Sequence, residues 1–269
     1  MTSRDYGKAL ARAAAGALLF SFPLLMTMEM WQLGFAIERV RLLAFVLLSL
    51  PMLLGVSYFV GFEPTFRLKD EVLDAVAGFA VGFIVVAAML WMFNVLSARD
   101  PLDEFIGKTA LAAVPAAMGA LLAGKQFGDV DRTTREERRA GYPGHLFIMA
   151  VGALFLAFAV APTEEMQLIA FKMTAAHALV LVAVSIAILH AFAYALGFPG
   201  EDNRRAHGRF AHTFAAYTLA EYGVALVISA YSLWTFGRLD GLSFHQQVMT
   251  TVVLALPAAM GAATARLVA

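Results

Sequence analysis

Two adjacent carboxylates interrupt an otherwise apolar stretch in the middle of the chain. The stretch is VAPTEEMQLIAF, residues 160–171, and the pair is Glu164 and Glu165. A second stretch, LLMTMEMWQLGF at residues 24–35, holds Glu29 at the position that matches Glu165. A charged side chain costs about 2.5–3.5 kcal/mol near the centre of a membrane helix. A carboxyl group in such surroundings takes up a proton, pairs with a cation of the protein, or holds a transported cation.

The residues beside the pair favour a proton or a hard cation. Pro162 has no backbone N–H and clashes with the carbonyl of Phe158, so we expect a kink just before the two glutamates. A freed carbonyl, the hydroxyl of Thr163 and two carboxylates are all oxygen ligands. Such ligands suit calcium, magnesium, manganese or sodium.

Two other interpretations of these glutamates stay open at this point. Glu29 and Glu165 can be protonated, or paired with Lys172 or Arg238 near the rim, and so lock two helices together. Pro162 can form a packing kink that holds no ion.

Two further ionisable residues are predicted to lie within membrane spans. Glu221 falls in the seventh predicted span and His190 in the sixth. His190 is either a hydrogen-bonded bundle histidine or part of a proton relay with Glu221. The candidate ion- or proton-binding residues are therefore Thr27, Glu29, Thr163, Glu164, Glu165, His190 and Glu221, with Glu29, Glu164 and Glu165 as candidate metal ligands.

The composition indicates a membrane protein around these residues. Hydrophobic residues make up 61% of the 269-residue chain and charged residues 15%, against about 25% charged in soluble domains. The formal net charge is zero, which gives no basic field for nucleic acid. The chain has no cysteine, so disulfides, thiolate catalysis and iron–sulfur clusters are excluded. We expect no cofactor beyond a bound hard cation.

Eight apolar segments are long enough to be helices across a bilayer, which needs about 20 residues. The fold class predicted is an all-α polytopic membrane protein with eight transmembrane helices. Their approximate bounds are 9–35, 40–62, 70–97, 103–124, 144–171, 174–198, 209–236 and 245–267. With eight spans, the side that holds both termini carries 14 basic residues and the other side six. This bias predicts that both termini are cytoplasmic.

The chain is predicted to be a tandem duplication. Residues 16–35 match residues 152–171 at eight of 20 positions, including the pattern T-x-E-M. The sequence PAAMGA occurs at 115–120 and again at 257–262. We therefore expect two four-helix repeats of parallel orientation, related by an axis along the membrane normal that brings Glu29 and Glu165 to equal depth. The repeats span residues 1–124 and 144–269, joined by a cytoplasmic linker at 125–143.

These patterns favour transport of a cation or proton, by a channel or a secondary transporter, through an acidic site near the outer side of the bilayer. An intramembrane enzyme is the alternative from another class, because APTEEMQLIA resembles the EExxxR element of membrane-embedded CAAX proteases. The arginine of that element is missing, so we expect no enzyme. A structural or accessory membrane protein is a third possibility.

The sequence as a whole resembles a bacterial family of integral membrane proteins of unknown function. The resemblance rests on PLLMTMEMW, GALFLAFAVAPTEEM and PAAMGA, and it spans nearly the whole chain. It implies a multi-pass protein of the bacterial inner membrane and implies no activity. The partners expected are the lipid bilayer and a cation or proton, with no nucleic acid and with homo-oligomers as an option.

Overall fold

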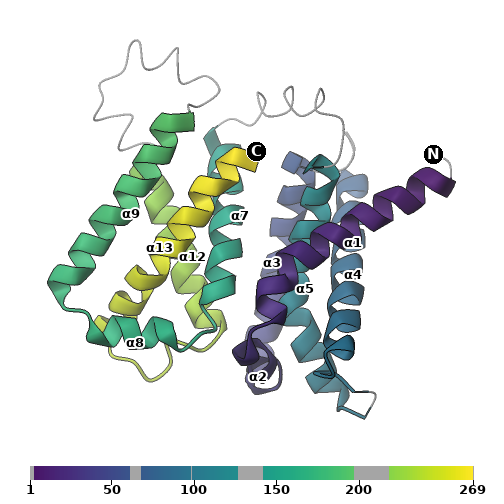
Figure 1. Cartoon of the computed structure of the whole chain (residues 1–269), viewed down its shortest axis with the longest axis horizontal. Coiled ribbons are helices and arrows are strands. Elements are labelled where there is room, and N and C mark those ends of the chain that lie inside the picture. Colours follow the sequence, from purple (N-terminus) through teal and green to yellow (C-terminus); the bar gives the residue numbers. More distant parts are fainter. Residues whose placement is uncertain (1–2, 61–67, 98, 127–141, 197–217, 269) are drawn as a thin grey trace. The chain divides into compact units, whose positions relative to one another are not determined.

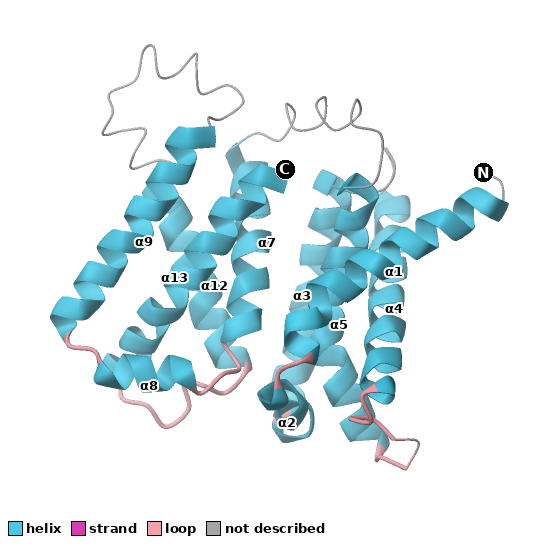
Figure 2. Cartoon of the chain, in the orientation of Figure 1, coloured by secondary structure: helices cyan, strands magenta, loops and turns pink. Residues whose placement is uncertain are grey.

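Helices form the regular structure throughout the described part of the chain. The computed structural model describes residues 3–60, 68–97, 99–126, 142–196 and 218–268. Within these ranges there are ten helices and no strand (Figure 2). The predicted all-α fold class is confirmed.

The chain divides into two compact units, Met1–Thr133 and Thr134–Ala269. Within each unit the described helices follow the same order, which is one long helix, one short helix and three further helices (Figure 1). Unit 1 contains α1 (Ser3–Leu25), α2 (Met28–Ala36), α3 (Arg39–Val60), α4 (Leu68–Met92) and α5 (Leu102–Gln126). Unit 2 contains α7 (Tyr142–Val160), α8 (Glu165–Lys172), α9 (Ala175–Leu196), α12 (Ala220–Thr235) and α13 (Phe244–Val268).

Seven of the described helices are long and apolar enough to cross a membrane. Their candidate spans are Gly7–Leu25, Arg39–Tyr58, Glu71–Met92, Leu102–Ala123, Tyr142–Val160, Ala175–Phe192 and Phe244–Ala265. Helix α12 has 16 residues in its described part, and the start of the predicted span at 209–236 lies outside the described residues. The polytopic architecture is confirmed, whereas the count of eight spans is not.

The first predicted span of each repeat is broken into two helices. Helix α1 ends at Leu25 and α2 begins at Met28, whereas α7 ends at Val160 and α8 begins at Glu165. The continuous spans 9–35 and 144–171 are therefore wrong. A kink in one continuous helix was expected at Pro162. The helix instead ends before this proline, and α8 runs across the long helices of unit 2 (Figure 1). We call the end of each unit where α2 or α8 lies the turn end, and the opposite end, where α1 or α7 begins, the starting end.

One central helix organises the core of each unit. Helix α5 packs against α1, α2, α3 and α4, and α13 packs in the same way against α7, α8, α9 and α12. Every residue from Thr109 to Leu121 of α5 is buried. Small side chains dominate this run, and small residues let membrane helices approach closely.

The two units use the same glycine pair where their first and last helices cross closely. In unit 1, Gly16 of α1 lies against Gly119 of α5, and in unit 2, Gly152 of α7 lies against Gly261 of α13. A Cβ added at any of these glycines would overlap a carbonyl oxygen of its partner. The sequence alignment had matched Gly16 with Gly152 and one PAAMGA copy with the other. Matched residues therefore make matched contacts within each unit.

Candidate functional site

The glutamates of the repeated T-x-E-M pattern lie beyond the ends of the candidate spans. Glu29 is in the first turn of α2 and Glu165 is the first residue of α8, directly after Glu164. Glu164 and Glu165 are exposed and Glu29 is half-buried. The expectation that they sit inside continuous spans is wrong, because α1 and α7 end before them.

The pattern instead describes how one helix stops and the next begins. The hydroxyls of Thr27 and Thr163 donate to the carbonyls of Pro23 and Val160, at 2.6 and 2.8 Å, and so bind carbonyls at the ends of α1 and α7. The glutamate that follows lies in the first turn of the next helix, where a negative charge is favoured. Both methionines of the pattern are buried and anchor the short helix.

A cation of the protein binds a carbonyl in the turn between α7 and α8. Arg238 donates from Nη2 to the carbonyl oxygen of Pro162. Gln167 of α8 in turn donates from Nε2 to the carbonyl of Arg238, at 2.7 Å. These two hydrogen bonds connect the α7–α8 turn to the α12–α13 turn. In unit 1 a different side chain binds a carbonyl at the corresponding helix end, because Trp31 Nε1 donates to the carbonyl of Leu25, the last residue of α1, at 2.9 Å.

Within the described part of the chain, no three His, Asp or Glu side chains gather as metal ligands would. Glu29 belongs to unit 1, and Glu164 and Glu165 belong to unit 2. A cation held by all three stays a prediction from the sequence.

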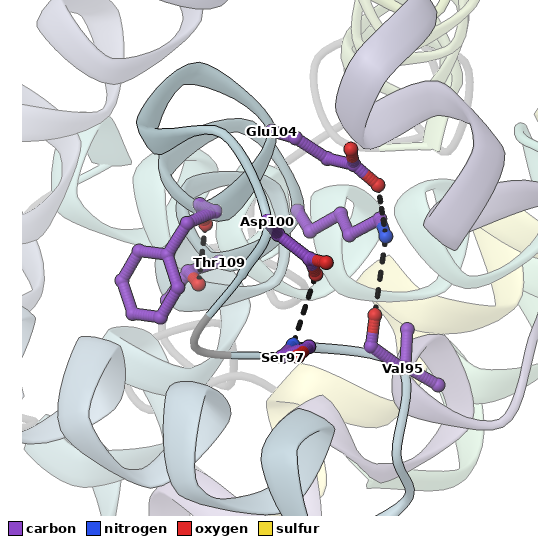
Figure 3. A network of polar contacts seen from close by, with 7 residues as sticks. Val95, Ser97, Asp100, Glu104 and Thr109 are labelled. Atoms are coloured by element: carbon purple, nitrogen blue, oxygen red, sulfur yellow. Dashed lines mark hydrogen bonds and ion pairs between the residues drawn. The ribbon is translucent and has the colours of Figure 1, made fainter.

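A network of polar contacts joins the residues at the turn end of unit 1, and Figure 3 shows it around Val95, Ser97, Asp100 and Glu104. Lys108 Nζ lies 2.5 Å from a carboxylate oxygen of Glu104 and donates to the carbonyl of Val95 at 3.1 Å. Its side chain is only 10% exposed. The nearby loop is closed by Asp100, which accepts from the backbone N–H of Ser97 at 2.9 Å. Sequence analysis missed this network, although Glu104 and Lys108 have the i, i+4 spacing of a helical ion pair.

Glu221, at the start of α12, is a buried acid of unit 2. Its side chain is 0% exposed, and one carboxylate oxygen lies 3.8 Å from Nε2 of His145 on α7. The His145 side chain is 22% exposed. Three residues before Glu221, Thr218 places its hydroxyl 3.1 Å from Nδ1 of His190 on α9. We call these four residues the buried acid site.

The buried acid site lies at the starting end of unit 2. His145 is near the beginning of α7, His190 near the end of α9, and Glu221 near the beginning of α12. Tyr222 follows Glu221 and is buried, and its hydroxyl has no hydrogen-bond partner among the described residues. Of the predicted candidates, Glu221 and His190 both lie at this end of unit 2, and His190 contacts Thr218, three residues before Glu221. The sequence analysis missed His145.

The buried acid site belongs to one repeat only. The repeat alignment also matches SYFVGF (57–62) with AYALGF (193–198) and LWMF (90–93) with LWTF (233–236). It places Gly78 where unit 2 has Glu221, and Leu54 where unit 2 has His190. Duplicated residues explain the common scaffold, and this site is what unit 2 adds to it.

Comparison with protein families decides which family the chain belongs to. The model of the family described as "Putative integral membrane protein (DUF2391)" matches residues 9–269. The chain belongs to the DUF2391 family. It is therefore an integral, multi-pass membrane protein, as the DUF2391 description and the seven candidate spans both indicate, and it sits in a lipid bilayer. Comparison with curated proteins and with solved structures gives no significant match.

Proposed function

We propose that this integral membrane protein moves protons across the bilayer and that Glu221 carries the proton. The observation that supports the proposal is a fully buried carboxyl group 3.8 Å from an imidazole nitrogen. Ionisable groups within membrane helices face the bundle interior and commonly belong to proton relays. Glu221 fits this description in its burial and in its partner.

The pairing with histidine favours a proton over a hard metal cation. Calcium, magnesium and sodium prefer oxygen ligands, whereas an imidazole exchanges protons near neutral pH. A carboxyl and an imidazole can share one proton, either as a neutral pair or as an ion pair. Each change of occupancy alters the charge of the buried acid site, and such a change can be coupled to movement of the helices that enclose it.

The arrangement also offers a route by which a proton reaches Glu221. His145 is partly exposed, so its imidazole can exchange protons from the starting end of the unit. Thr218 lies three residues before Glu221, just before α12 begins. The hydroxyl of Thr218 lies 3.1 Å from Nδ1 of His190, and a hydroxyl both donates and accepts hydrogen bonds.

The orientation of the chain determines which side supplies the proton. The excess of basic residues predicted on the side of the termini supports a cytoplasmic position for them. In that orientation His145 and His190 face the cytoplasm. The turn ends, with Glu29 and Glu165, face the opposite side.

Proton flux into liposomes tests the proposal. The purified full-length protein is reconstituted in vesicles that contain a pH-sensitive dye, and a pH gradient is imposed. We expect Glu221→Gln to lower the flux at least about tenfold, because the amide keeps the shape of the side chain and cannot exchange the proton. Asp103→Asn is the matched control, since Asp103 is an exposed acid on α5.

Size-exclusion chromatography of each variant shows whether it is folded. Flux that persists unchanged in a folded Glu221→Gln protein would remove Glu221 as the carrier. Loss of flux in the Asp103→Asn control would show that the effect does not belong to the buried acid site.

A further inference from the structure

Unit 1 holds a buried carboxyl group of its own, which the function proposed above does not use. Glu71 lies in the first turns of α4, inside a candidate membrane span, and is 7% exposed. We propose that Glu71 is a second proton-binding carboxyl, held by Ser57, so that each unit of the chain binds one proton. This inference goes beyond the proposed function because Glu71 and Glu221 lie in different units.

The contact between Glu71 and Ser57 suits a group that gains and loses a proton. The hydroxyl oxygen of Ser57 on α3 lies 2.6 Å from Oε2 of Glu71, and Ser57 is 2% exposed. A distance in this range is typical of a hydroxyl that donates to a carboxylate. The same hydroxyl can accept a hydrogen bond from the protonated acid, whereas a lysine or arginine at that place could only donate.

The two units place this polar contact at corresponding positions in their folds. In unit 2, His190 of α9 meets Thr218, which lies just before α12, and the alignment places Leu54 and Ala75 of unit 1 at those two positions. Ser57 lies three residues after Leu54, and Glu71 lies four residues before Ala75.

Because the two helices of such a hairpin run antiparallel, these offsets move the contact by one helical turn toward the α3–α4 connection. Both units therefore join their second and third long helices by a polar contact near the starting end, at registers one turn apart.

Other charged groups surround this end of α4 and belong to the same electrostatic environment. The ionisable side chains that α4 and its neighbours bring to the starting end are Lys69 and Asp74 on α4, Tyr58 on α3, and Lys8 and Arg12 on α1. Over its described side chains, α5 carries its charges at the turn end, around Lys108. Basic and acidic groups are both present, and the test below is designed to separate their influence from that of Ser57.

Covalent labelling by a hydrophobic carbodiimide reads out the proton on Glu71 directly. The reagent reacts with protonated carboxyl groups in apolar surroundings, and peptide mass spectrometry locates the adduct. The full-length protein in lipid vesicles is labelled at several pH values. We expect labelling of Glu71 to decrease as the pH rises, and to be unaffected by Glu221→Gln.

Ser57→Ala separates proton binding from a merely structural contact. Removing the hydroxyl takes a strong donor away from the ionised acid, so the fraction of Glu71 labelled at neutral pH should rise, by up to about tenfold. Ser49→Ala is the matched control. Ser49 is buried on the same helix, and its hydroxyl donates to the backbone carbonyl of Val46 at 2.7 Å.

The outcomes distinguish this inference from the proposed function. No labelling of Glu71 at any pH, with Glu221 labelled, would overturn the second proton site and leave the first. Equal labelling in Ser57→Ala and wild type would also overturn it. Labelling of Glu71 with none at Glu221 would support this inference and count against Glu221 as the carrier.

Discussion

Replacing the crossing glycine of either unit by alanine should destabilise the protein, whereas the same change at Gly223 should not. A Cβ at Gly119 would lie 2.6 Å from the Cβ of Phe20 and 2.8 Å from the carbonyl carbon of Gly16. Carbon atoms in contact lie about 3.5–4.0 Å apart, so α1 and α5 would have to separate by roughly 1 Å. A Cβ at Gly223 meets nothing within 4 Å.

The magnitude follows from the cost of overpacking, which is about 1–3 kcal/mol. For a unit of this size, that cost lowers the melting temperature by about 5–10 °C. Gly261→Ala should produce a decrease of similar size, because Gly261 meets Gly152 as Gly119 meets Gly16. Gly223→Ala should keep or slightly raise the melting temperature, since alanine is favoured over glycine within a helix by about 0.5–1 kcal/mol.

Thermal unfolding of the detergent-solubilised protein measures these shifts. Equal melting temperatures for Gly119→Ala and Gly223→Ala would refute the close crossing of α1 and α5. A large decrease for Gly119→Ala with none for Gly261→Ala would refute the equivalence of the two crossings.

Three further predictions concern the turn ends. Arg238→Gln should lower the free energy of unfolding by about 1.5–3 kcal/mol, because it removes a charged donor from the Pro162 carbonyl. Lys172→Gln, at an exposed position, should change the free energy of unfolding by less than about 0.5 kcal/mol. Chemical denaturation measures both changes. Lys108→Met should destabilise unit 1 more than Arg39→Ala in the same measurement, since the Lys108 side chain is 10% exposed and that of Arg39 is 89% exposed. If Glu165 holds a hard cation, Glu165→Gln should abolish manganese binding followed by electron paramagnetic resonance; a folded variant that binds manganese as the wild type does would contradict that prediction.

Composition and internal repetition were enough to predict the scaffold. A chain with so little charge lacks the polar surface of a soluble domain, which indicated a protein embedded in lipid. Lipid cannot satisfy the backbone groups of an open strand edge, so the apolar segments were predicted to be helices. The paired PAAMGA copies predicted a duplication, and both copies lie in central helices, where their glycines make matching contacts. These features depend on local sequence and on the bilayer, so a single chain reveals them.

The candidate site was less predictable because it depends on tertiary contacts. Hydropathy averages over a window, so it did not show that α7 stops at Val160 and that Glu165 starts a new helix. The T-x-E-M pattern was read as chemistry, but its threonine and methionine have structural roles at a helix break. His145 and Glu221 are far apart in the sequence, and only the packing of α7 against α12 brings them together.

The most direct measurement is a pH-dependent infrared difference spectrum of the protein in lipid. Protonated carboxyl groups give a carbonyl-stretch band that ionised carboxylates lack. If Glu221 binds and releases a proton, Glu221→Gln removes one component of this band, and Glu165→Gln leaves that component in place. Identical difference spectra for wild type and Glu221→Gln would show that Glu221 does not exchange a proton and would contradict the proposed function.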